Sequence, residues 1–164
     1  MKIIISRLSE EEWEKYRDIR LEALKNDSIA FGSSFEEEKE REAAVWRSRI
    51  KDALFALNQN NEPVGLLAFL FNNRKKTKHR ADIFSVYVKP DYRGKRIGFR
   101  LIEETLKLIK ENKDIIKVNL TVNPLQLSAI KLYEAFGFKR VGTLSKEIQI
   151  GGKYYDEDLM ELVF

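Results

Sequence analysis

A short basic segment with two glycines, residues 93–98, has the composition of an anion-binding loop. It reads Arg-Gly-Lys-Arg-Ile-Gly, follows a β-rich run that ends at Pro90, and precedes a stretch with helical apolar periodicity. The first amide groups of a helix have no intrahelical partner, and the helix dipole is positive at that end. A phosphate group is therefore favoured there, and glycines let its oxygens approach the backbone. Taken alone, the segment is equally compatible with a plain strand-to-helix turn.

A second motif follows in the C-terminal half of the chain. It comprises Leu-Thr-Val-Asn-Pro at residues 120–124 and Ala-Ile-Lys-Leu-Tyr-Glu-Ala-Phe-Gly-Phe at residues 129–138. Together with the basic loop, it resembles the GNAT superfamily of N-acetyltransferases, which use acetyl-CoA. The resemblance extends over the whole chain in the order of its elements. It is most specific over residues 84–138.

Two positions depart from the pattern of that superfamily. Arg96 stands where the first glycine of the pyrophosphate motif is usual. Binding of the pyrophosphate requires only the backbone N–H of this residue, so an arginine is tolerable there if the position is already helical. Gln126 stands where an asparagine is usual, and it offers the same amide groups one methylene further out.

The resemblance implies a binding site for acetyl-CoA. The pyrophosphate would bind the basic loop, and pantetheine would lie between two parallel strands that splay apart, residues 82–89 and 116–122. A backbone N–H of the first strand would polarise the thioester carbonyl and hold the oxyanion. The residues implied to bind the co-substrate are Val86, Tyr87, Val88, Arg93, Gly94, Lys95, Arg96, Ile97, Gly98, Phe99, Gln126 and Tyr133.

The resemblance also implies a catalytic acid, Tyr133, which would protonate the departing thiolate. A phenol with a pKa near ~10 can donate a proton to a thiolate. The alternative is that Tyr133 is a packing residue, because Leu132 and Phe136 lie beside it on an apolar helix face.

The general base is left open by the sequence. Some relatives carry a glutamate at the position of Thr121, whose hydroxyl cannot serve. Asp82, Glu36 and Glu37 are candidates, and the two glutamates are expected to be solvated charges. A water chain, or attack by an amine that is already neutral, would also suffice.

The acceptor is expected to contact two variable segments, residues 30–35 and 153–156. Phe31, Phe35, Tyr154 and Tyr155 would contribute to an aromatic slot, and Asp156 would bind a cation. The alternative is that these residues only pack around the hairpin. The predicted function is transfer of an acetyl group to a primary amine of a small molecule, by direct attack in a ternary complex. The alternatives are a protein N-terminal or lysine acetyltransferase and a catalytically silent CoA-binding module.

Composition limits the class of protein. The 164 residues, 43% hydrophobic and 34% charged, suit a single domain over residues 1–164 with its own core. The absence of cysteine excludes disulfides, thiolate metal sites and cysteine nucleophiles, and no metal site is expected. The net charge of +4 is weak support for nucleic-acid binding, and the longest apolar run, residues 64–71, is far below the roughly 20 residues that span a bilayer. We expect a cytoplasmic protein without nucleic-acid or membrane partners.

A homodimer is expected on two grounds. Many GNAT relatives pair through their C-terminal strands, and this chain ends in an apolar strand, residues 159–164.

The elements that must position these residues form an α/β pattern. We predict a GNAT-type mixed, mostly antiparallel sheet of six to seven strands with helices on both faces. The predicted helices are residues 10–26, 36–50, 95–112 and 127–136. The predicted strands are residues 2–7, 53–58, 64–71, 82–89, 116–122, 138–143, 144–150 and 153–164.

Overall fold

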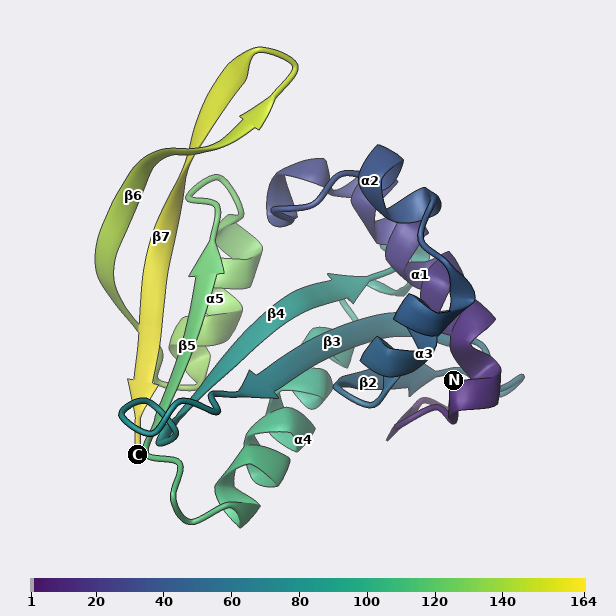
Figure 1. Cartoon of the computed structure of the whole chain (residues 1–164), viewed down its shortest axis with the longest axis horizontal. Coiled ribbons are helices and arrows are strands. Elements are labelled where there is room, and N and C mark those ends of the chain that lie inside the picture. Colours follow the sequence, from purple (N-terminus) through teal and green to yellow (C-terminus); the bar gives the residue numbers. More distant parts are fainter. Residues whose placement is uncertain (1) are drawn as a thin grey trace.

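The computed structural model describes residues 2–164 as a seven-stranded sheet with helices on both faces (Figure 1). The strands are β1 Ile4–Ser6, β2 Ala53–Leu57, β3 Pro63–Phe71, β4 Arg80–Val88, β5 Lys117–Val122, β6 Lys139–Ile150 and β7 Lys153–Val163. The helices are α1 Trp13–Asn26, α2 Phe35–Lys39, α3 Ala43–Ile50, α4 Ile97–Glu111 and α5 Leu127–Ala135, with 3-10 turns at Glu10–Glu12, Ser28–Ala30 and Pro90–Tyr92.

The strands lie in the order β1-β2-β3-β4-β5-β7-β6, and all neighbours are antiparallel except β4 and β5. The predicted α/β class, with a mostly antiparallel sheet and helices on both faces, is therefore confirmed. Within residues 2–164, no helix is both long and apolar enough to cross a membrane.

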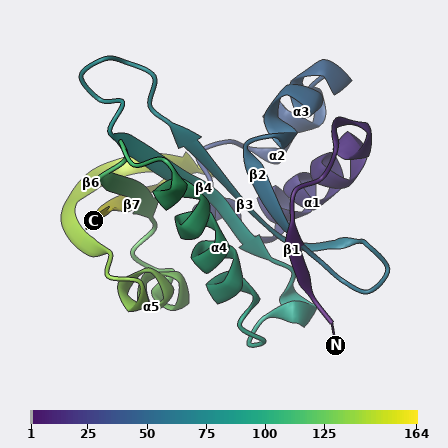
Figure 2. The ribbon, with the colours of Figure 1, turned by 90° about the horizontal axis from the view of Figure 1, so that it is seen from below.

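Two apolar clusters hold the helices to the two faces of the sheet (Figure 2). On one face, α4 buries Leu101, Ile102 and Ile109 against the sheet, and α5 packs beside it. On the other face, α1 and α3 bury a second cluster that includes Trp46 and Phe55. The i, i+3, i+4 spacing of apolar residues in α4 produces its single buried stripe.

The two parallel strands separate after a short contact. β4 pairs with β5 only from Arg80↔Lys117 to Asp82↔Asn119, and beyond that point the strands diverge (Figure 1). The Asp82 carboxylate fixes the joined end, because it accepts hydrogen bonds from the Asn72 amide at 2.7 Å and the Asn119 amide at 3.2 Å. The divergence leaves backbone groups of both strands free to pair with something else.

A bulge interrupts β4 where the strands diverge. Leu66 pairs with Tyr87 and Ala68 with Phe84, so β4 carries one extra residue between these pairs. Ser85 lies in this bulge with a φ of 56°, in the left-handed region. The bulge therefore changes the direction of the backbone just before Val86 and Val88.

The predicted helix over residues 36–50 is wrong, because two helices occupy this segment. α2 ends at Lys39, and α3 begins after Glu42, whose ψ of 156° is extended. Because of this break, each of the two helices buries one polar side chain that has a hydrogen-bonding partner. Glu38 pairs with Arg20 of α1, and the Trp46 indole N–H donates to the Arg41 carbonyl at 3.2 Å.

The predicted pair of strands over residues 138–143 and 144–150 is also wrong, since β6 is continuous. A bulge lies between Leu144 and Ile148, where Lys146 has a φ of 56°. The backbone N–H of Lys146 donates to the Asp156 carboxylate of β7 at 2.8 Å, which holds the bulge in register.

The strand on which the dimer expectation rested lies inside the sheet. β7 is bonded to β5 on one side and to β6 on the other, so β6 is the edge strand. β7 has no free edge for pairing with a second copy.

Candidate active site

The basic loop leads directly into α4, as the sequence predicts. The amide of Arg100 makes the bond to the Arg96 carbonyl at 3.1 Å that starts the helix. The amides of Ile97, Gly98 and Phe99 precede it and have no helical acceptor. Together with the helix dipole, they form a site suited to a phosphate group.

Arg96 is not helical, contrary to the condition set from the sequence. It is the N-cap of α4 with a φ of 59° and a ψ of 18°, in the left-handed region where glycine is favoured. This explains why a glycine is usual at that position of the motif. The Arg96 guanidinium lies over the Phe99 ring at 4.7 Å, and this contact compensates part of the backbone strain.

The other two cations of the loop brace its backbone. The Arg93 side chain donates to the Val88 carbonyl at 2.9 Å and to the Asp27 carboxylate at 2.6 Å. Lys95 donates to the Asp91 carbonyl at 2.7 Å. These contacts fix the loop against the end of β4.

A groove of about 790 Å³ begins at this loop and follows the opening between β4 and α5. All the residues predicted to bind acetyl-CoA line it except Lys95 and Tyr133. Val86, Gln126, Ala129 and Leu132 belong both to this groove and to a cavity of about 290 Å³ at its inner end. The groove and the cavity therefore adjoin each other at the gap between the splayed strands.

The side chain of Tyr87 points away from these two spaces toward α1. Its hydroxyl donates to the Glu22 carboxylate at 2.9 Å and accepts from the Asn26 amide at 2.9 Å. Burial is the main cause that raises the pKa of Tyr87 to about 12. Any contact of Tyr87 with the predicted ligand is thus through its backbone, while its side chain fixes β4 to α1.

Tyr133 lies on α5 and lines the inner cavity. Its side chain is buried, and its ring packs edge-on against Phe138 with centroids 6.1 Å apart. Burial raises the pKa of Tyr133, so the hydroxyl stays protonated over the ordinary pH range. Tyr133 is the one tyrosine that lines the inner cavity among the residues that the structure describes.

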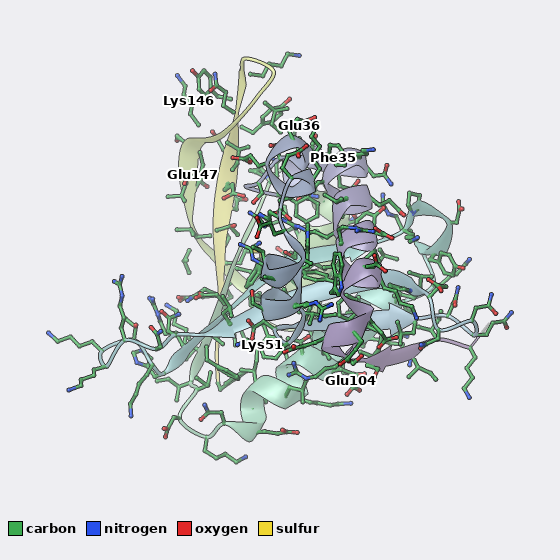
Figure 3. All side chains as sticks on the ribbon, turned by 45° about the vertical axis from the view of Figure 1, so that its right-hand side comes forward. Phe35, Glu36, Lys51, Glu104, Lys146 and Glu147 are labelled. Carbon is green, nitrogen blue, oxygen red and sulfur yellow. The ribbon has the colours of Figure 1, made fainter. Side chains whose placement is uncertain are left out.

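The predicted acceptor residues fall into two groups. Phe31 and Phe35 line an open groove between α2 and the β6–β7 hairpin, and Phe31 also lines the inner cavity. Figure 3 labels Phe35 and Glu36 on α2, and Lys146 and Glu147 on the separate hairpin. Among the described residues, Tyr154 and Asp156 are absent from the linings of both spaces. Tyr154 is exposed, and Asp156 holds the β6 bulge.

The candidate bases named from the sequence have structural roles or lie apart from the cavity. Asp82 holds the joined end of β4 and β5. Glu37 forms a capping box with Ser34, whose hydroxyl accepts from the Glu37 amide at 3.2 Å. Glu36 lines the open groove and not the inner cavity. Within residues 2–164, no three His, Asp or Glu side chains are grouped to hold a metal ion.

Two charged groups on the cavity wall were missed by the sequence analysis as site residues. Arg20 is buried, donates to the Ser85 hydroxyl at 3.1 Å, and pairs bidentately with Glu38 at 3.0 and 2.8 Å. The sequence feature that could have identified Arg20 is its position as a charged residue on the apolar face of a predicted helix. Glu157 of β7 also lines the cavity. No local pattern distinguishes it from its acidic neighbours.

Comparison with known proteins places these features in one family. The model of the Acetyltransferase (GNAT) family matches residues 7–138. An uncharacterized N-acetyltransferase of Methanocaldococcus jannaschii is 33% identical over 93 residues, which are 56% of this chain and 41% of that protein. Spermidine N(1)-acetyltransferase of Vibrio cholerae is 31% identical over 85 residues, 52% of this chain and 49% of that protein. Each match spans less than half the length of the curated relative.

A solved structure resembles the whole chain. Phosphinothricin acetyltransferase of Sinorhizobium meliloti, in complex with acetyl-CoA, superimposes with a TM-score of 0.81 at 20% identity. The alignment covers 100% of this chain and 89% of that one. At this level of identity, the similarity shows a common fold.

Proposed function

Because the chain belongs to the acetyltransferase (GNAT) family, we propose that it transfers an acetyl group from acetyl-CoA to a primary amine of a small molecule. The observation that carries the proposal is a pair of adjoining spaces at the gap between β4 and β5. The groove includes the first residues of α4, and the cavity beside it is lined by Tyr133 and Glu157. The acetyl-CoA complex of the structural relative and the polyamine substrate named for the Vibrio relative support the same chemistry.

The residues present fit acetyl-CoA as co-substrate. The pyrophosphate would bind the amides of Ile97, Gly98 and Phe99, and pantetheine would pair with β4 in the gap beside β5. The thioester would then lie at the inner cavity, where a backbone N–H of the β4 bulge could hold the oxyanion. The bulge is fixed from the other side by the hydrogen bond from Arg20 to Ser85.

The transfer would proceed by direct attack. The amine nitrogen forms a bond to the thioester carbon, and the carbon–sulfur bond breaks with its electron pair on sulfur. Tyr133 donates its hydroxyl proton to the thiolate and regains a proton from the nitrogen. The products are the amide and free CoA.

A small acceptor is favoured by the size of the space. The inner cavity of about 290 Å³ continues into a chamber of about 270 Å³ between α1–α3 and the sheet. The chamber shares Arg20, Ser33 and Ser85 with the cavity and also contains Arg49 and Asp52. Enclosed spaces near this size accommodate small molecules.

Acetyl-CoA is expected to raise the melting temperature, because a ligand that binds only the folded state stabilises it by about 2.7 kcal/mol at a hundred times its Kd. Arg96→Gly should keep this shift, since the glycine supplies the same amide, and should itself stabilise the protein by about 1 kcal/mol through relief of the left-handed strain. Arg96→Glu keeps the strain but sets a carboxylate beside the phosphates, and most of the shift should disappear.

Calorimetry with acetyl-CoA and a thiol-release assay with pooled amines test this proposal together. No thermal shift at millimolar acetyl-CoA would refute the binding site. A thermal shift without thiol release from any amine would favour the silent CoA-binding module, and release only with peptides would favour the protein acetyltransferase.

We further propose that the protein is a cytoplasmic homodimer without nucleic-acid or membrane partners. The edge strand β6 and the exposed apolar side chains Val141, Val163 and Phe164 offer a surface for a second copy. Light scattering at high protein concentration should give twice the 19.3 kDa chain mass, and a strictly monomeric mass would contradict the dimer.

A further inference from the structure

A carboxylate and a phenol from different elements share the inner cavity. Glu157 comes from β7 and Tyr133 from α5, and both line the same space of about 290 Å³. The register Thr121↔Leu159 between β5 and β7 explains the position of Glu157. Alternate residues of a strand share a face, so Glu157 lies on the face of Leu159 and Thr121. The Thr121 side chain also lies close enough to the Glu157 carboxylate to lower its pKa.

We propose that Glu157 is the general base that removes a proton from the acceptor ammonium group before attack. The inference rests on the proposed acetyl transfer and assigns the base for it. An ammonium proton passes to the Glu157 carboxylate, and the freed nitrogen lone pair forms the carbon–nitrogen bond as the carbon–sulfur bond breaks. A second nitrogen proton leaves through Tyr133 to sulfur, and Glu157 returns its proton to solvent.

The surroundings of Glu157 suit this role. Burial raises the pKa of Glu157, the nearby Thr121 side chain lowers it, and the charge of Glu147 on β6 raises it further, with a net rise. A raised pKa makes the ionised carboxylate a better proton acceptor at neutral pH. The other charged group on the cavity wall, Arg20, is committed to Glu38 and Ser85. No other carboxylate lines the inner cavity among the residues that the structure describes.

The test is the isosteric change Glu157→Gln, assayed with an amine that the wild-type protein acetylates. We expect kcat to fall about 100-fold at neutral pH, the usual scale for one positioned base. The thermal shift with acetyl-CoA should be retained, because Glu157 does not line the groove of the predicted co-substrate. The acidic fall of wild-type kcat/KM, set by protonation of Glu157, should be replaced in the variant by a fall at higher pH that follows the pKa of the amine, because only the neutral amine can then attack.

Two neighbouring carboxylates provide controls. Glu161→Gln changes the same face of β7 at an ion pair with Lys117 and should leave kcat unchanged. Glu147→Gln removes the charge that raises the Glu157 pKa, so the acidic limb of the pH profile should move to lower pH. A limb that does not move in this variant would contradict the assignment of that limb to Glu157.

The outcomes separate the two proposals. An active wild type with an unaffected Glu157→Gln variant overturns the base role alone. The same holds if Glu157→Gln raises only the KM for the amine, because the carboxylate would then bind the cation without taking its proton. A wild type that binds acetyl-CoA and acetylates no amine overturns the proposed function, and the base role with it.

Discussion

Replacing Tyr133 by phenylalanine is expected to lower the turnover number by about 100-fold and to leave acetyl-CoA affinity nearly unchanged. The variant keeps the ring, and with it the edge-on contact with Phe138. It removes the one dissociable proton of that side chain. The predicted contacts to phosphate and pantetheine involve backbone groups elsewhere, so binding should persist.

The kinetic signature distinguishes an acid from a packing residue. Because the lost interaction would exist only in the transition state, kcat and kcat/KM should fall together. Stopped assays of thiol release at saturating acceptor, with melting temperatures as a check on folding, provide the measurement. A rate within a few-fold of wild type, with thiol release rate-limiting, would remove Tyr133 from the mechanism. The thiolate would then leave unassisted or take its proton from water.

Glu38→Gln is expected to lower the free energy of unfolding by about 3 kcal/mol. Glu38 is fully buried and forms ion pairs with Arg20 at 2.8 Å and Arg41 at 3.2 Å. Removing its charge leaves a buried guanidinium without a counter-ion. Glu40→Gln is the matched control, because its side chain is 78% exposed, and its effect should stay within about 0.5 kcal/mol.

The loss of stability caused by Glu38→Gln should depend on pH. Burial disfavours the charged form of Glu38, but the hydrogen bonds and charges of Arg20 and Arg41 outweigh it and lower the pKa below the ordinary 4.5. A lowered pKa means that the stabilisation is complete above the unfolded-state pKa and is lost as the pH falls through the folded-state pKa. At neutral pH, urea unfolding should therefore give a lower free energy of unfolding for Glu38→Gln than for the wild type, and this difference should shrink below pH 4.5. A difference that stayed constant would show that the charge of Glu38 is not its cause.

The parts of the site that depend on local sequence could be predicted. The basic loop, the start of α4 and the position of Tyr133 on α5 follow from residues that are close in the chain. The backbone of Arg96 could not be predicted, because the left-handed conformation is normally signalled by glycine and this chain has arginine there.

The features of the fold and the site that depend on residues far apart in the chain could not be predicted. The break between α2 and α3 follows from burial of Glu38 against Arg20, a residue of another helix. Alternation places Glu157 and Leu159 on one face of the last strand, but only the pairing of β7 with β5 decides that this face meets Thr121. The residue that we propose as the general base could therefore not be identified from the sequence alone.

The gap between β4 and β5 has a consequence for the order of events in a reaction cycle. The groove at α4 adjoins the inner cavity at Val86 and Gln126, whereas the open groove beside α2 and the β6–β7 hairpin adjoins it at Phe31, Gly32 and Ser33. In the proposed reaction, neither substrate would have to pass through the entrance of the other. The proposed reaction would therefore allow random-order binding, and a chain without cysteine has no thiol on which to store the acetyl group between two half-reactions. The acetylated amine and free CoA would then leave independently, each through its own groove.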